Sequence, residues 1–277
     1  MTTQHDKALL LRALHRPGDP LLLANVWDAA GTRLVAATGA AAIATASASV
    51  SWTLGFPDGD RADLAQVLAQ TALVVRAAGE LPVTVDLESG FADTAAGVGG
   101  TITALLATGA VGVNLEDTGP DGAAPLRPVA EAARRIAAAR AAADAAGVAL
   151  FVNGRTDVFL RAVGDPADRL GEAVARARAY VEAGADGVFV PGVADPDTVA
   201  ALVAAVPAPL NVLAGSGAPG VADLAKLGVA RISLGPGLAR AAYTALRGAA
   251  EEFYTSGTYG ALDGGLSYGE LNGLLGG

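Results

Sequence analysis

Short apolar runs alternate with longer amphipathic or alanine-rich segments along almost the whole chain, and this alternation predicts its secondary structure. Each apolar run ends within a few residues at a turn or at a polar side chain. Runs of this kind are typical of strands that are buried on both faces of a parallel sheet. The expected strands are 21–24, 41–45, 82–86, 111–115, 150–153, 187–190, 210–213 and 231–234. The expected helices are 28–38, 61–78, 94–108, 129–145, 168–183, 196–205, 221–227 and 237–254.

Eight successive strand–helix units indicate an α/β fold. A closed (β/α)8 TIM barrel is the expected arrangement, although doubly wound sheets share the alternation. Glycines that follow helices, at Gly39, Gly109 and Gly184, fit left-handed C-caps and mark the end of the barrel opposite the active site. The length of 277 residues suits one barrel, and no linker interrupts the chain. We therefore expect one domain, 1–277, with a C-terminal helix and a glycine-rich tail from about residue 237.

Composition narrows the possible partners and the location of the protein. The net charge is −9, from 19 basic and 28 acidic residues, which argues against nucleic acid because phosphate contacts need a basic face. The N-terminus lacks the pattern of a signal peptide. Apolar runs also stop well short of the roughly 20 residues that a membrane span needs. We expect a cytoplasmic protein that binds neither nucleic acid nor membranes.

Several catalytic devices are missing from the sequence. It contains no cysteine, so disulfides and thiolate nucleophiles are excluded. Its two histidines, His5 and His15, precede the first strand, where we expect surface or lid-side positions rather than a catalytic triad or a zinc site. Neither Lys7 nor Lys226 ends a strand, which argues against a Schiff-base aldolase.

Three carboxylates stand where two successive strands end. Asp86 and Glu88 follow the third apolar run, and Glu116 follows the fourth. Carboxylates that crowd one edge of a sheet repel each other unless a cation lies among them. Because oxygen ligands suit hard ions, the pattern predicts Mg²⁺, or Mn²⁺, as the cofactor. The alternative is that these acids are ordinary helix caps or solvated loop residues.

Two further polar residues lie on later strands. Arg155 ends the fifth strand, where it could bind a carboxylate or stabilise a developing oxyanion, and it could also form a structural salt bridge to Glu116 or Asp157. Asn211 lies on the seventh strand, as either a substrate ligand or a hydrogen-bonded core amide.

Small residues and glycines suggest places for an anion. Ser47 and Ala48 follow the second strand, where backbone amides could approach an anion, and Asp58 lies in the loop beyond them. The segment 215–220 matches G-x-G-x-x-G only weakly as a dinucleotide fingerprint. With Gly235 and Gly237 it forms either a phosphate cradle or plain tight loops.

Taken together, these motifs resemble the isocitrate lyase/phosphoenolpyruvate mutase family, and the match runs from about residue 22 to 246. It rests on the segments 47–58, 86–90, 115–117, 155–157 and Asn211. The resemblance implies a (β/α)8 barrel that binds Mg²⁺ and a small 2-oxo acid or its enolate. It also implies a C-terminal helix that is swapped between subunits, and hence a homodimer or homotetramer.

The resemblance also implies roles for particular residues. Asp86 would bind the metal directly, and Glu88 and Glu116 would hold metal-bound water. Ser47 and the amide of Ala48 would bind the substrate carboxylate, with Asp86 and Asn211 also in the binding site. Arg155 would face the keto oxygen. Arg155, Asp58 and Glu116 are the expected catalytic residues.

One segment departs from the pattern of the family. Lyases of the family carry a Lys-Lys/Arg-Cys-Gly-His loop after the Glu-Asp pair, whereas residues 118–126 contain no Cys, Lys or His. We therefore expect an Mg²⁺-dependent carbon–carbon lyase that cleaves or decarboxylates a small 2-oxo or 2-hydroxy di- or tricarboxylate, with residues 119–122 as a short lid. The alternatives are a mutase-like enzyme that acts on P–C bonds and a non-catalytic barrel that binds a 2-oxo acid.

Overall fold

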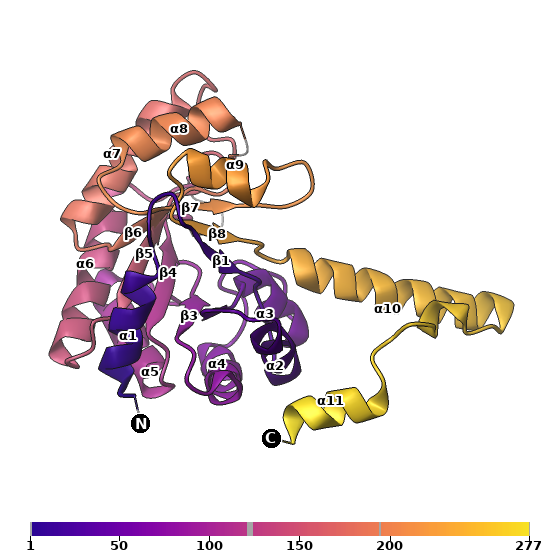
Figure 1. Ribbon diagram of the computed structural model, residues 1–277. Coiled ribbons are helices and arrows are strands. Elements are labelled where there is room, and N and C mark those ends of the chain that lie inside the picture. The colour runs from indigo at the N-terminus through magenta and orange to yellow at the C-terminus, as the bar shows by residue number, and fades with distance from the viewer. Residues whose placement is uncertain (1, 121–123, 194, 277) are drawn as a thin grey trace.

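Eight parallel strands form a barrel in the computed structural model, which describes residues 2–120, 124–193 and 195–276 (Figure 1). The strands follow the order β1-β8-β7-β6-β5-β4-β3-β2. A parallel bridge between Val26 and Thr45 connects the ends of β1 and β2 and closes the barrel. The predicted (β/α)8 architecture is therefore confirmed.

The observed elements follow the predicted alternation. The strands are β1 (Leu21–Leu23), β2 (Ile43–Ala44), β3 (Val83–Asp86), β4 (Gly112–Glu116), β5 (Phe151–Arg155), β6 (Gly187–Phe189), β7 (Leu210–Leu213) and β8 (Arg231–Ser233). The helices that surround them are α2 (Ala29–Ala37), α4 (Leu64–Ala78), α5 (Ala95–Ala107), α6 (Val129–Ala145), α7 (Arg169–Glu182), α8 (Pro196–Ala205) and α9 (Val221–Lys226). The glycines at 39, 109 and 184 have positive φ angles just after helices, as predicted.

A helix that we did not predict, α1 (Gln4–Ala13), packs at the N-terminal end of the barrel. Its Gln4 side chain donates hydrogen bonds to the carbonyl groups of Leu106 and Ala110. His15 follows the helix and stacks on Phe151 of β5, with ring centroids 3.9 Å apart. Only 7% of His15 is exposed, so the expected surface or lid-side position of this histidine was wrong.

The barrel interior combines close packing with a polar centre. A Cβ atom at Gly112 would lie 2.6 Å from Leu11, so this position needs glycine. Above it, the Asn153 amide donates to the side-chain oxygens of Asn114 and Asn211. Asn211 itself donates to the carbonyl oxygen of Val212. Asn211 is therefore a hydrogen-bonded core amide in this structure.

The C-terminal segment leaves the barrel as an arm. Helix α10 (Gly237–Ser256) projects away from the strands, and the chain returns through a 3-10 turn (Gly260–Leu262) to α11 (Tyr268–Leu275), which contacts α2 (Figure 1). Ala239 is the buried residue of α10. Large apolar side chains on the arm are exposed, among them Leu246 at 64% and Tyr254 at 83%. No helix in the described ranges combines the length and apolar character needed to cross a membrane.

Candidate active site

The predicted site residues meet at the C-terminal end of the strands. Asp86, Glu116 and Arg155 are the last residues of β3, β4 and β5. Glu116 and Arg155 are register partners in neighbouring strands. Because side chains alternate along a strand, this register directs both toward the barrel axis.

Arg155 lies at the centre of a group of carboxylates. Its guanidinium is 2.7 Å from Asp157, 2.9 Å from Glu116 and 3.4 Å from Asp86. Burial disfavours the charge of the guanidinium, but the carboxylates outweigh burial and raise the pKa of Arg155. Both roles that we considered for Arg155 are therefore compatible, because it forms structural ion pairs and also lines a cavity.

The strand-end carboxylates repel one another. Burial is the main cause that raises the pKa of Glu116 to about 8, and Asp157 and Asp86 add to it against the opposing effect of Arg155. Burial, followed by Asp58, Asp60 and Asp86, raises the pKa of Glu88 to about 8. The pKa of Asp86 is also raised, by burial and by Asp58. A cation among these groups would relieve both the burial cost and the repulsion.

Glu88 does not converge fully with the other two carboxylates. Its Oε2 atom accepts hydrogen bonds from the backbone amides of Gly59, at 2.6 Å, and Asp60. Across the described ranges of the chain, no three Asp, Glu or His side chains are arranged to bind one ion together. Mg²⁺ commonly binds through one or two carboxylates and keeps several waters, so an oxygen-only donor set with one direct ligand still fits this ion.

A cavity of about 170 Å³, the inner cavity, lies between the strand ends. It brings together the predicted residues Ser47, Ala48, Asp58, Asp86 and Arg155. Ser47 begins α3 (Ser47–Thr53), a short helix without a side-chain cap that we had expected to be loop. Asn211 is buried below the inner cavity and does not line it.

Sequence reasoning missed other residues of the inner cavity. Asn25 follows β1, and its strand-end position could have been noticed in the sequence. Phe189 ends β6 and lies 5.6 Å from the Arg155 guanidinium, while Leu160 comes from the turn after β5. These apolar side chains carry no sequence signal that distinguishes them from core residues.

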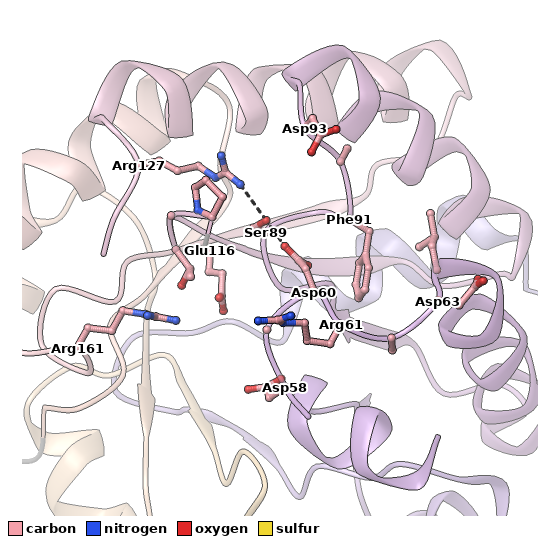
Figure 2. A pocket seen from close by; sticks show the side chains of 17 residues that line it. Asp58, Asp60, Arg61, Asp63, Ser89, Phe91, Asp93, Glu116, Arg127 and Arg161 are labelled. Carbon is pink, nitrogen blue, oxygen red and sulfur yellow. Dashed lines mark hydrogen bonds between the residues drawn. The ribbon is translucent and has the colours of Figure 1, made fainter. Parts of the chain in front are cut away.

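A second cavity of about 740 Å³, the outer cavity, opens beside the first (Figure 2). Asp58 lines both cavities, and Glu116 lines the outer one. Figure 2 shows the side chains of Arg61 and Arg161 pointing into it from opposite sides. The two cavities together could hold a small ligand and a second substituent on it.

Backbone strain is concentrated at this end of the barrel. Asp60, Glu88 and Phe91 have φ angles of 55°, 49° and 50°, a region that non-glycine residues rarely adopt. Strained residues of this kind cluster at functional sites, where the surrounding structure holds them. The strain therefore supports the assignment of this region as the active site.

Hydrogen bonds join neighbouring strand ends around six of the eight strands, from β8 through β1 to β5, and we call this set the strand-end ring. The bonds run from Leu234 N to Asn25 Oδ1, from Asn25 Nδ2 to Thr45 O, from Asp86 N to Thr45 Oγ1, from Glu116 N to Glu88 O and from Asp157 N to Asp117 Oδ1. Asp117 is fixed in turn by Tyr180, at 2.7 Å, and by Arg176, at 3.1 Å. The ring therefore holds Asp157, and through it Arg155, in place.

The loop after β4 begins and ends at closely spaced points. Thr118 and Leu126 form an antiparallel bridge, and the Arg127 amide donates to the Asp117 carbonyl at 2.7 Å. The predicted lid includes residues 121 and 122, which lie outside the described residues.

Gly215 and Gly237 line a third cavity of about 820 Å³, so the two glycine segments lie together after β7 and β8.

Comparisons with known proteins identify the family of this chain. A family model described as phosphoenolpyruvate phosphomutase matches residues 11–254. The uncharacterized protein Rv1998c of Mycobacterium tuberculosis (strain ATCC 25618 / H37Rv) is 36% identical over 80% of each chain. An oxaloacetate decarboxylase of Bradyrhizobium sp. (strain BTAi1 / ATCC BAA-1182) is 33% identical over 82% of this chain and 75% of that protein.

Solved structures extend the comparison to three dimensions. A putative phosphonomutase from Burkholderia cenocepacia J2315 is 46% identical, with a TM-score of 0.85 over 92% of this chain and 100% of the other. A phosphonopyruvate hydrolase solved with oxalate and Mg²⁺ is 26% identical, with a TM-score of 0.85 over 98% of this chain and 95% of the other. With the barrel and its acidic strand ends, these matches show that the chain belongs to the phosphoenolpyruvate phosphomutase family, within the isocitrate lyase/PEP mutase superfamily of carbon–carbon lyases and mutases.

Proposed function

We propose that the protein is an Mg²⁺-dependent lyase that cleaves or decarboxylates a small 2-oxo or 2-hydroxy di- or tricarboxylate through an enolate. The observation that carries this proposal is the inner cavity, which is lined by Asp86 and Arg155. The carboxyl group of Glu116, which is 2.9 Å from Arg155, has a pKa raised to about 8 by burial. The cavity volume of about 170 Å³ suits a ligand of a few carbon atoms. The bound oxalate and Mg²⁺ of the related phosphonopyruvate hydrolase support the same ligand class.

The metal would be held directly by Asp86 and through water by Glu88 and Glu116. When bound, the ion would supply positive charge that stabilises an enolate as a bond to the substrate breaks. The proposal requires Glu88 to release the amides of Gly59 and Asp60, or to reach a metal-bound water with its other oxygen.

The chain's own residues would bind and orient the substrate. Ser47 and the amide of Ala48 would hold one carboxylate, because the first amides of a helix have no acceptor within it. Arg155 would face the keto oxygen, kept in that direction by the bonds of 2.7 and 2.9 Å that Asp157 makes with its Nε and Nη2 atoms. Phe189 and Leu160 would exclude water from the other side.

Residues 118–126 determine which reaction we favour. Because they contain no Cys, Lys or His, the familiar acid or base of the lyases cannot come from this segment. Decarboxylation or cleavage that relies on the enolate and water needs the fewest additional groups. We therefore favour a slow and permissive lyase or decarboxylase, a choice that the oxaloacetate decarboxylase relative supports.

Phosphonate chemistry is the second candidate function. It is favoured by the 46% identity to a putative phosphonomutase, the highest identity among the comparisons given above. In this case the inner cavity would bind the 2-oxo acid part and the outer cavity the phosphonate. A barrel that binds a 2-oxo acid without turnover is the remaining alternative.

Steady-state turnover on four substrates tests the proposal. Oxaloacetate, methylisocitrate, isocitrate and phosphonopyruvate should be compared at one Mg²⁺ concentration, with excess EDTA as the control. We expect slow, EDTA-sensitive turnover of oxaloacetate. Cleavage of isocitrate or methylisocitrate with kcat/KM near the roughly 10⁴–10⁸ M⁻¹s⁻¹ of ordinary enzymes would contradict our interpretation of the loop. Conversion of phosphonopyruvate into a different phosphorus compound, detected by phosphorus NMR, would establish the second candidate.

We also propose that the protein is a cytoplasmic homodimer or homotetramer. The support for assembly is the C-terminal arm, whose apolar side chains Leu246, Phe253 and Leu262 are each at least 51% exposed. A helix that is apolar on a face with no partner commonly marks an interface with another chain. Exchange of α10 between subunits would cover this face.

A further inference from the structure

Arg161, which lines the outer cavity, has no role in the site described so far. Arg155 is already engaged by Asp86, Glu116 and Asp157, so it has little capacity for a second anionic group on a substrate. Asp58, which lines both cavities, would repel such a group where they meet. A substrate with a second acidic group therefore needs another cation beyond these carboxylates.

Arg161 is placed to supply this cation. Its guanidinium points into the outer cavity opposite that of Arg61, with Glu116 between them (Figure 2). The ion pair that Arg161 makes with Asp157 is long, at 3.7 Å, and both Asp157 oxygens already bind Arg155 at 2.7 and 2.9 Å. The Arg161 side chain is 42% exposed, so a ligand can reach it.

Arg127, the third arginine of the outer cavity, is occupied in a different way. Its Nη1 atom pairs with Glu131 at 3.0 Å, and its Nη2 atom donates to Ser89 at 3.3 Å. Only 9% of its side chain is exposed. Arg127 therefore braces the wall of the cavity rather than facing a ligand.

The turn that carries Arg161 is held rigidly. The backbone amide of Arg161 donates to the carbonyl oxygen of Asp157, and the amide of Val163 donates to the carbonyl oxygen of Val158. Gly192, after β6, packs so closely that a Cβ atom there would lie 2.7 Å from the Leu160 nitrogen. Leu160 lines the inner cavity and Arg161 the outer cavity, so one rigid turn spans both. The backbone of Arg161 is thus held at a fixed position relative to the inner cavity.

We propose that Arg161, facing Arg61, determines substrate specificity by binding a second acidic group, a carboxylate or a phosphonate, on a 2-oxo acid whose reacting end occupies the inner cavity. The inference rests on the proposed function, because it takes the inner cavity as the 2-oxo acid site. Arginine suits this role since its planar guanidinium binds two oxygens of either group at once.

Calorimetric binding to the Mg²⁺-loaded protein tests the inference with three ligands. 3,3-Difluorooxaloacetate carries a second carboxylate and cannot enolise, because its C3 has no proton. 2-Oxobutyrate has a methyl group in place of that carboxylate, and phosphonopyruvate has a phosphonate. The proteins are wild type, Arg161→Gln, Arg161→Lys and a charge-matched control, Arg16→Gln, whose side chain is 63% exposed and which precedes β1 at the opposite end of the barrel.

Loss of a charge-assisted hydrogen bond should weaken the affinity of Arg161→Gln for an acidic ligand roughly ten- to a hundredfold. We expect this loss for difluorooxaloacetate, for phosphonopyruvate, or for both, with a much smaller change for 2-oxobutyrate. Arg161→Lys should recover part of the affinity, and Arg16→Gln should match wild type. The ligand with the larger loss identifies the acidic group that the site prefers.

Two results would overturn the inference alone. One is equal affinity of Arg161→Gln and wild type for both acidic ligands. The other is an equal loss for all three ligands, which would indicate general damage to the site. If wild type binds none of the three with Mg²⁺ present, the proposed function fails and the inference fails with it.

Discussion

Acidification should destabilise the protein through His15, the histidine buried beneath the barrel. Its Nδ1 atom lies 2.7 Å from the carbonyl oxygen of Leu11, so Nδ1 carries the proton and donates. No hydrogen-bond partner of Nε2 is found in the described part of the chain. Burial, with the nearby charge of Arg231, lowers the pKa of His15 from 6.5 to about 3. The folded protein therefore keeps this imidazole neutral under conditions where the unfolded chain protonates it.

The sign and size of the effect follow from proton linkage. Between pH 6.5 and 3 the unfolded state binds the additional proton, so the free energy of unfolding rises with pH in this window. The contribution of His15 is complete above pH 6.5 and decreases as the pH falls toward 3. With these two pKa values, the loss between pH 8 and pH 5 is about 2 kcal/mol.

Urea unfolding of wild type and His15→Phe, followed by circular dichroism between pH 8 and pH 4.5, measures this contribution. Phenylalanine keeps the stack on Phe151 and cannot titrate, and it loses one hydrogen bond that costs about 1 kcal/mol at every pH. The buried carboxylates affect both proteins equally, so the difference between the two curves isolates His15. Parallel curves, with no change in their separation from pH 8 to pH 5, would refute the reasoning.

Four further predictions concern the site and the arm. Asp86→Asn should weaken Mg²⁺ binding in calorimetry more than Glu88→Gln, since a direct ligand contributes more than one that acts through water, and the opposite order would contradict our metal assignment. Asp117→Asn removes the buried carboxylate that faces Arg176 and Tyr180, and should lower the free energy of unfolding by about 3 kcal/mol, whereas a loss below about 1 kcal/mol would show that Glu172 suffices for Arg176. Gly192→Ala, at a φ of 86° and close to Leu160, should cost about 2 kcal/mol in urea unfolding, while Gly171→Ala in α7, where a Cβ has free space, should cost nothing. Truncation before Gly237 should give a monomeric or insoluble protein, and a stable full-length monomer in light scattering at micromolar concentration would argue against the exchanged arm.

The barrel could be predicted from the sequence because its strands are buried on both faces and therefore appear as apolar runs. Three helices gave no such signal. α3 has buried Ser47, Ser49 and Ser51 on several sides, so its pattern is not amphipathic. α1 buries only Ala8 and Leu11, and α11 buries none of its residues. Helices that bury so little leave no clear periodicity to recognise.

The site could be predicted from the sequence only in part. Asp86, Glu116 and Arg155 could be found because the ends of parallel strands meet at one edge of a barrel. The orientation of Glu88 could not, since it depends on amides of Gly59 and Asp60, which are distant in the sequence. Asn211 has the same residue type whether it binds a substrate or the polar interior, and only its neighbours Asn153 and Ser233 distinguish the two.

The strand-end ring has a consequence for how reactions diverge on this scaffold. The loop after β4 is attached at two points joined by the bond from the Arg127 amide to the Asp117 carbonyl, and the ring itself runs through Asp117 rather than through the loop. Because the cost of closing a loop grows slowly with its length, segments of different length can be inserted there without moving Arg155. Loops with different lengths and different side chains can thus replace one another at this point during evolution, while the strand ends that position Arg155 are inherited unchanged.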